Sequence, residues 1–152
     1  MKIIPMTAEH LHEVFQIEES SFSTPWSFEA LSKELTDNKN AHYFVAVNSA
    51  GALLGYAGLW HVVNEGHITN IAVAAEHRKK GVGSALVRQL IAFAREKQMI
   101  ALTLEVRYNN AAAQKLYLSH GFTIEGRRKQ YYSDTKEDAL IMWLVIPNTY
   151  DL

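Results

Sequence analysis

A basic turn with two glycines joins an apolar stretch to a helical pattern, and its residue types suit a phosphate ligand. The turn reads Arg-Lys-Lys-Gly-Val-Gly-Ser over residues 78–84. Glycines let a ligand approach the main chain, and the first N–H groups of a helix have no partner within the helix. These features together predict a phosphate or pyrophosphate site. A tight strand-to-helix loop with solvated charges remains the alternative, because the P-loop pattern and the dinucleotide pattern G-x-G-x-x-G are both absent.

Two other side chains could move protons. Glu105 lies in the strand-like segment 101–107, whose alternation puts Leu104 and Val106 on one face and Glu105 and Arg107 on the other. Its carboxylate could act as a general base or simply pair with Arg107 or a lysine. Tyr117 lies in a short helical segment. It could donate a proton as a general acid or be a core tyrosine.

The composition limits the class of protein. The chain has 152 residues, the size of one domain, so residues 1–152 are expected to form a single domain. It contains no cysteine, which excludes cysteine chemistry and fits a reducing compartment. A net charge of -1 gives no overall electrostatic footprint for nucleic acid. No apolar run reaches the roughly 18 residues of a membrane helix. The start turns polar too soon for a signal peptide, so a cytoplasmic protein is expected.

The elements that would position these residues follow from hydrophobic periodicity and turn signals. Strands are predicted over residues 2–7, 41–47, 53–63, 67–74, 101–107, 122–133 and 138–146, and helices over 8–22, 27–37, 84–98 and 110–121. The order predicts an α/β fold of the α+β type, with a central mixed sheet and helices on both faces. Residues 67–107 should form a parallel β-α-β unit with a right-handed crossover.

Several motifs together resemble one family. The segment R-x-x-G-V-G-S-A-L after I-A-V resembles the acetyl-coenzyme A (acetyl-CoA) loop of the GCN5-related N-acetyltransferases (GNAT). The later segment LEVRYNNAAAQKLYLSHGF resembles the strand and helix that follow in that superfamily. More narrowly, TNIAV, LEVR, RRKQYY, EDALIMW and PWS resemble the bacterial enzymes that acetylate the N-terminal alanine of a small-subunit ribosomal protein. The resemblance spans nearly the whole chain, with one departure at Asn109, where serine is expected.

The resemblance implies an N-alpha-acetyltransferase with the GNAT fold that uses acetyl-CoA as co-substrate and no metal. Ile71, Ala72 and Val73 would pair with the pantetheine arm, and Asn110 would contact the coenzyme. The pyrophosphate would be bound by main-chain N–H groups and basic side chains of Arg78, Lys79, Lys80, Gly81, Val82, Gly83 and Ser84. Glu105 would be the base and Tyr117 the acid. Because a carboxylate is a weaker base than an amine, the proton would pass through water, reach a carboxylate made more basic by burial, or leave in a prior equilibrium.

The acceptor peptide is expected between STPWS and RRKQYYS. Trp26 and Tyr131 are its candidate binding residues, although Trp26 fits the core equally well. Tyr131 and Tyr132 are expected to alternate along a strand, so that one reaches substrate. The run of Arg127, Arg128 and Lys129 suggests either RNA contact or a charged strand edge. We expect the edge and no nucleic-acid contact.

Other functions remain open at this point. The acceptor could be a protein lysine or a small amine, or the chain could be a non-catalytic coenzyme-binding or ribosome-docking module. A metal site at His61, Glu65 and His67 is not expected, because the spacing of H-E-x-x-H is absent. We expect a monomer that uses direct attack in a ternary complex, because no cysteine can carry the acetyl group.

Overall fold

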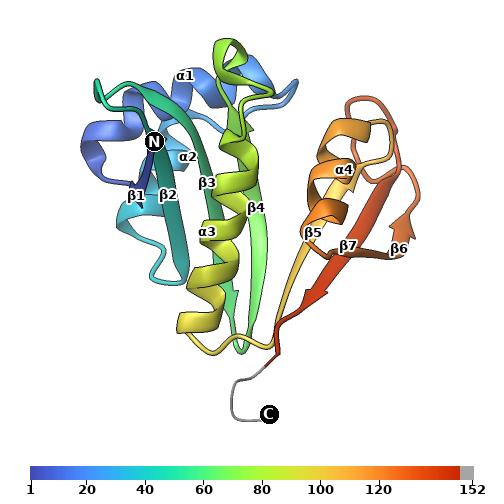
Figure 1. The fold of residues 1–152 in the computed structure, drawn as a ribbon. Helices are drawn as coiled ribbons and strands as arrows, with labels where there is room; N and C mark the ends of the chain where they lie inside the picture. The colour runs from blue at the N-terminus through green and yellow to red at the C-terminus, as the bar shows by residue number, and fades with distance from the viewer. Residues whose placement is uncertain (148–152) are drawn as a thin grey trace.

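A seven-stranded mixed sheet forms the centre of the computed structural model, which describes residues 1–147 (Figure 1). The spatial order is β1-β2-β3-β4-β5-β7-β6. The pair β4–β5 is parallel, and the other neighbouring pairs are antiparallel. The strands are β1 (Lys2–Pro5), β2 (Ala41–Val47), β3 (Leu53–Val62), β4 (Glu65–Val73), β5 (Ala101–Arg107), β6 (Thr123–Arg128) and β7 (Ala139–Val145). The predicted α/β class with a mixed sheet is confirmed.

Helices cover both faces of the sheet. One face carries α1 (Leu11–Ser21) and α2 (Phe28–Thr36), and the other carries α3 (Val82–Glu96) and α4 (Ala111–Ser119). In α3, Leu86 and Leu90 recur one turn apart and are fully buried, which is worth roughly 2 kcal/mol for each side chain. Each face therefore has its own apolar core.

The sheet opens between β4 and β5. Their parallel pairing covers Glu65–His67 against Ala101–Thr103, and no further pairs follow. Figure 1 shows the two strands diverging from this base, with α4, β6 and β7 on the β5 side of the gap. The gap divides the sheet into two parts, one on the β4 side and one on the β5 side. The second half of β4 is paired with β3 alone.

A β-bulge at Thr69 changes the face on which the following β4 side chains lie. Gly58 of β3 pairs with Asn70 and Leu59 pairs with Ile68, so Thr69 is the extra residue. Before the bulge Ile68 packs in the core under α3. After it Ala72, also an even-numbered position, packs in the core under α1. Asn70 is turned to the α1 face by the same shift.

One predicted strand is too long. The segment expected as strand over 122–133 ends as β6 at Arg128, so Tyr131 and Tyr132 do not alternate along a strand. Gln130 has a positive φ of 50°, and its N–H donates to the Asp138 carboxylate at 2.8 Å, which turns the chain away from the sheet. Residues 129–138 form the β6–β7 loop instead. In residues 1–147, no helix has the length and apolar character needed to cross a bilayer.

Candidate active site

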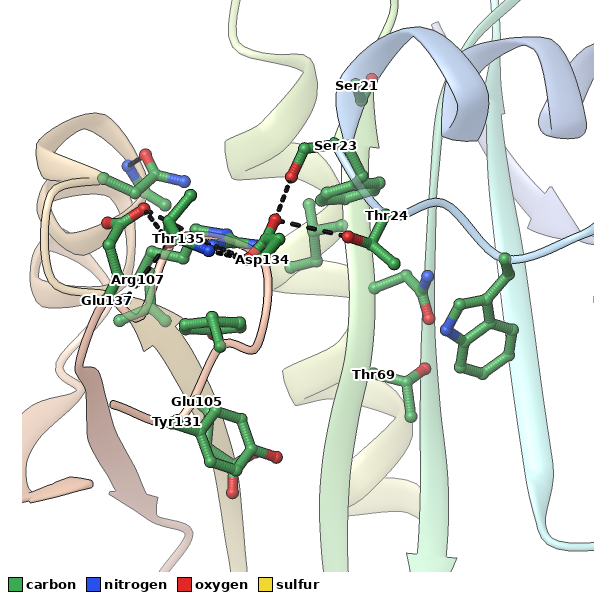
Figure 2. A pocket seen from close by; sticks show the side chains of 18 of the residues that line it. Ser21, Ser23, Thr24, Thr69, Glu105, Arg107, Tyr131, Asp134, Thr135 and Glu137 are labelled. Carbon is green, nitrogen blue, oxygen red and sulfur yellow. Dashed lines mark hydrogen bonds and ion pairs between the residues drawn. The ribbon is translucent and has the colours of Figure 1, made fainter. Parts of the chain in front are cut away.

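A cavity of about 780 Å³ lies where β4 and β5 separate (Figure 2). One wall combines β4 around Thr69–Ile71 with the α1–α2 loop. The other combines the end of β5, the start of α4 and the β6–β7 loop. The sequence-predicted residues Glu105, Tyr117, Asn110, Ile71, Trp26 and Tyr131 all line this cavity. Segments far apart in the chain therefore meet in one place.

Glu105 and Tyr117 approach the cavity from opposite faces of the sheet. The β5 residues Leu104 and Val106 pack in the core under α3 and α4, so Glu105 points to the α1 face. Tyr117, on α4, belongs to the core of the other face. The gap between β4 and β5 lets both side chains reach the same space. This arrangement suits a base on the acceptor side and an acid on the donor side.

The Glu105 carboxylate is accessible rather than buried. Its side chain is 38% exposed, and the nearest cation is Arg128, whose Nε lies 3.8 Å from Oε1. The alternative pairing with Arg107 does not form, because Arg107 binds Asp134 and Glu137. Water can therefore reach Glu105, and an ion pair to one exposed arginine leaves its second oxygen open as an acceptor.

Tyr117 is a buried phenol at the edge of the cavity. It is 8% exposed, and its ring packs against Phe122 with centroids 5.6 Å apart. Burial raises the pKa of Tyr117 well above its ordinary value, and the neighbouring Tyr132 adds to the shift. Within residues 1–147 its hydroxyl bonds to no protein group, although a core tyrosine normally has a partner, and the hydroxyl is not among the fully buried unpaired atoms, so it remains accessible from the cavity that Tyr117 lines. Tyr117 therefore carries its proton throughout the physiological range.

The glycine turn forms the start of α3. Gly81 is the N-cap residue and has a φ of 86°, and no side chain caps the helix. The helix begins at Val82, two residues before the predicted start, so Val82 and Gly83 lie in its first turn. Their N–H groups and that of Ser84 have no acceptor within the helix. A Cβ added at Gly81 would have nothing within 4 Å, so space for a ligand remains at the cap.

The basic side chains of this turn differ in their contacts. Arg78 folds back, and its Nε donates to the Val73 carbonyl at 3.1 Å. The Ser84 hydroxyl lies 2.7 Å from Nε2 of His120 and accepts Arg88 Nη1 at 2.9 Å. Thus the Ser84 main-chain N–H, not its hydroxyl, is available to an anion. Lys79 and Lys80 are exposed at the surface.

The strand before the turn and the start of α4 fit an extended coenzyme arm. Ile71, Ala72 and Val73 pair with β3 and have no strand partner toward β5. Asn110 caps α4, and its Oδ1 accepts the Ala113 N–H at 3.1 Å. An extended pantetheine arm could pair with the open edge of β4. The pyrophosphate at its end could then bind the uncapped N–H groups of α3, where the space at Gly81 is open. Contact of Asn110 with the coenzyme stays a prediction.

A buried polar cluster supports the β4 wall, and the sequence interpretation missed it. Glu18 of α1 is 1% exposed. Its carboxylate accepts the Tyr56 hydroxyl, the Asn70 Nδ2 at 3.0 Å and the Trp26 N–H at 2.9 Å. Desolvation of the phenol, followed by the charge of Glu18, raises the pKa of Tyr56. The signal was present, because Glu18 falls on the apolar face of α1 with Leu11 and Val14.

Trp26 and Tyr131 lie on opposite walls of the cavity. Trp26 is partly buried against the α1-face core and also lines the cavity, so both of its predicted environments occur together. Tyr131 is 48% exposed, whereas Tyr132 packs under the Arg107 guanidinium at 4.0 Å from its ring centroid. One tyrosine therefore faces the cavity opening and the other supports the loop, although neither is in a strand.

Two other charged or titratable groups that the sequence suggested as functional, Arg127 and His67, have structural partners. On β6, which is an edge strand, Nε of Arg127 lies 2.5 Å from Oδ2 of Asp138 in the β6–β7 loop. His67 Nε2 lies 3.2 Å from Glu65 Oε1, next to the β3–β4 turn. Among residues 1–147, no group of three or more metal-ligating side chains is arranged to hold an ion.

Comparison with known proteins gives consistent results. The model of the Acetyltransferase (GNAT) family matches residues 11–122. The chain is 43% identical over 141 residues to the putative ribosomal protein bS18-alanine N-acetyltransferase of Bacillus subtilis, covering 93% of each chain. It is 34% identical over 139 residues to the ribosomal protein bS18-alanine N-acetyltransferase of Escherichia coli, covering 90% of this chain and 91% of that one. The crystal structure of the Escherichia coli ribosomal-protein-S18-alanine N-acetyltransferase matches with a TM-score of 0.86 and 31% identity, over 95% of this chain and 93% of that one.

Proposed function

The chain belongs to the GNAT family of acetyltransferases, and from this we propose that it moves an acetyl group from acetyl-CoA to the N-terminal alanine of a small-subunit ribosomal protein. The similar proteins from Bacillus subtilis and Escherichia coli are named for this reaction. The observation that carries the proposal is the exposed Glu105 side chain on the α1 face, which shares one cavity with the largely buried Tyr117 from the other face. We also infer that residues 1–152 act as one domain and as a monomer.

The proposed coenzyme site runs from β4 to α3. Ile71–Val73 would bind the pantetheine arm through main-chain groups. The N–H groups of Val82, Gly83 and Ser84 would hold the pyrophosphate, with Lys79 and Lys80 offsetting its charge. Acetyl-CoA, when bound there, supplies an activated thioester whose acetyl group extends into the split.

The residues then move two protons. A peptide α-amine has a pKa of about 7.7–8.0, so most of it is an unreactive ammonium at neutral pH. Glu105 takes this proton, directly or through water, and the amine attacks the thioester carbonyl. A C–N bond forms, the C–S bond breaks, and the sulfur leaves with the bonding electron pair. Tyr117 keeps its proton at working pH because burial raises its pKa. It donates a hydrogen bond to the sulfur as charge develops there, and supplies the proton that converts the leaving thiolate to a thiol. The nitrogen, which is cationic after the attack, loses its second proton to water, and a proton from water restores the Tyr117 phenol after it has donated its own.

The acceptor class is tested by thiol release with three substrates. These are a peptide that begins with alanine and has no lysine, an Nα-blocked peptide that contains lysine, and a polyamine. Rapid release with the alanine peptide alone supports the proposal. A preference for the lysine peptide or the polyamine would replace it with the corresponding acceptor. Coenzyme binding without release for any amine would indicate a non-catalytic module.

A further inference from the structure

The Asp134 side chain bonds to residues of both walls on the acceptor side of the cavity. Asp134, in the β6–β7 loop, binds Arg107 of β5 on one side. On the other side it accepts the hydroxyls of Ser23 and Thr24 from the α1–α2 loop. Figure 2 shows these bonds as dashed lines between the walls. All four residues line the cavity, so the bridge lies where an acceptor chain would leave it.

We propose that Asp134 is a peptide-recognition residue, and that a main-chain N–H beyond the first residue of the acceptor replaces the Ser23 and Thr24 hydroxyls on its carboxylate. This inference rests on the proposed acetylation of a peptide N-terminus. In the free protein the two hydroxyls hold the groove closed. In the complex Asp134 remains on Arg107 and binds the peptide, so the enzyme distinguishes a peptide from a small amine.

The two sides of the bridge differ in strength. Arg107 binds Asp134 with both arms, at 3.1 Å to Oδ1 and 3.0 Å to Oδ2, a geometry that gives strong charge-assisted bonds. Arg107 also stacks on Tyr132 and reaches Glu137. The bond to Arg107 is the first of the causes that hold the pKa of Asp134 far below its usual range, so it is ionised whenever the protein works. The β6–β7 loop is therefore anchored to the β5 wall.

On the other side, two hydroxyl groups of the described residues bind the Asp134 carboxylate. Ser23 Oγ lies 2.5 Å and Thr24 Oγ1 lies 3.3 Å from Oδ2, and both residues are exposed. These bonds also go to a charged acceptor, but the released hydroxyls are exposed and find water partners, and a peptide N–H would replace them on the carboxylate. Opening of the groove on the α1–α2 side is therefore easier than detaching the loop from Arg107.

The crowding on one oxygen explains why exchange is favourable. Oδ2 receives three donors, from Arg107, Ser23 and Thr24, whereas a carboxylate oxygen offers about two lone-pair sites. Oδ1 is occupied by Arg107 and by the Thr135 N–H at 2.8 Å. One well-aligned amide N–H can take the place of both hydroxyls without disturbing the other contacts. A small amine that has no amide N–H cannot make this contact.

The test compares two acceptors with the same first residue. One is the alanine-starting peptide, and the other is alanine methyl ester, which has the α-amine but no amide N–H beyond the first residue. The variants are Asp134→Asn and the double variant Ser23→Ala with Thr24→Val. Thr36→Val is the matched control, because this exposed hydroxyl bonds only within α2 and to Asp37. Steady-state thiol release gives KM and kcat, and thermal melting reports folding.

The two variants should change KM for the peptide in opposite directions. Asp134→Asn should raise it roughly tenfold, because a bond to a charged acceptor is lost. The double variant should lower it roughly threefold, because its hydroxyls no longer compete. Neither should alter KM for alanine methyl ester, and Thr36→Val should alter nothing. A double variant with unchanged or raised peptide KM would overturn the inference, even if Asp134→Asn fails to fold. Wild-type protein that acetylates neither acceptor would refute the proposed function itself.

Discussion

At Glu105 and Tyr117 the same strand-and-helix unit offers two very different environments. The Glu105 side chain is 38% exposed and faces the acceptor loops, whereas Tyr117 as a residue is 8% exposed and its ring is packed in the opposite core. Solvent access favours proton acceptance and onward transfer at Glu105. Desolvation favours the neutral, proton-bearing form of Tyr117. The division of roles between base and acid follows from these environments.

Replacement of Glu105 by glutamine should slow the reaction in a pH-dependent way. We expect kcat/KM to fall by about 10²-fold near pH 7, where the acceptor is mostly ammonium and needs a base. The deficit should shrink near pH 9, because the amine is then deprotonated without help. The measurement is a pH–rate profile for the alanine peptide. Glu125→Gln is the control on exposed β6, and an equal deficit at all pH values would argue against the base role.

Replacement of Tyr117 by phenylalanine should reduce kcat by roughly 10²-fold, because the leaving thiolate loses its proton donor. Since the pKa of Tyr117 is raised, its acid form persists above the ordinary value of 10. The wild-type rate should therefore rise with pH as the ammonium of the acceptor loses its proton. It should not fall again up to about pH 10. Tyr108→Phe, on an exposed ring, serves as control. Full turnover by Tyr117→Phe would assign the residue to packing alone.

At the scale of elements, the start of α3 depends on a left-handed glycine. Gly81 and Gly51 have nearly the same φ, 86° and 84°, and a Cβ at either position would have nothing within 4 Å. Gly51 lies in the turn before β3, outside the residues that line the cavity. Comparing alanine variants at these two positions therefore separates the effect of backbone strain on stability from the effect of a methyl group on ligand binding.

Alanine at Gly81 and at Gly51 should lower the free energy of unfolding by a similar amount, about 1–2 kcal/mol, from the left-handed backbone. Only Gly81→Ala should also weaken coenzyme binding, by roughly tenfold or more, because its methyl group occupies the space above the N–H groups. Isothermal titration with acetyl-CoA and chemical denaturation measure the two effects. Equal affinity in both variants would place the pyrophosphate elsewhere.

Periodicity predicted most elements, and it failed where tertiary contacts override it. The helices and strands around Gly81, Glu105 and Tyr117 have clear apolar repeats and turn signals, so their order was predictable. The end of β6 was not, because the chain leaves the sheet through a contact between Gln130 and Asp138. The bulge at Thr69 also has no signal in the residue pattern, since it depends on register with β3.

Across the whole molecule, the site depends on bonds between residues far apart in the chain. Asn70 meets Glu18 across 52 positions, and Asp134 meets Ser23 across 111. Such pairs cannot be read from spacing, which explains why the motifs identified the reacting groups but not their supports. Glu18 links α1, β3, β4 and the segment at Trp26, so it joins the elements of one cavity wall.

Removal of the Glu18 carboxylate should therefore destabilise the fold as well as the site. We expect Glu18→Ala to lower the free energy of unfolding by about 3 kcal/mol, because the donors of Tyr56 and Asn70 are left buried without an acceptor. The adjacent Glu19→Ala is the matched control, since this side chain is exposed and should change stability little. Chemical denaturation gives both values. A loss below about 1 kcal/mol for Glu18→Ala would show that water replaces the carboxylate.

The most direct test of the central claim is the position of the transferred acetyl group. Small-subunit ribosomal proteins are incubated with acetyl-CoA and either the wild-type chain or Glu105→Gln, and each product is sequenced by tandem mass spectrometry. We predict one acetyl group on the α-amine of a protein that begins with alanine, formed quickly by the wild type and slowly by the variant. Acetyl groups on lysine side chains, or equal labelling by both proteins, would contradict the account.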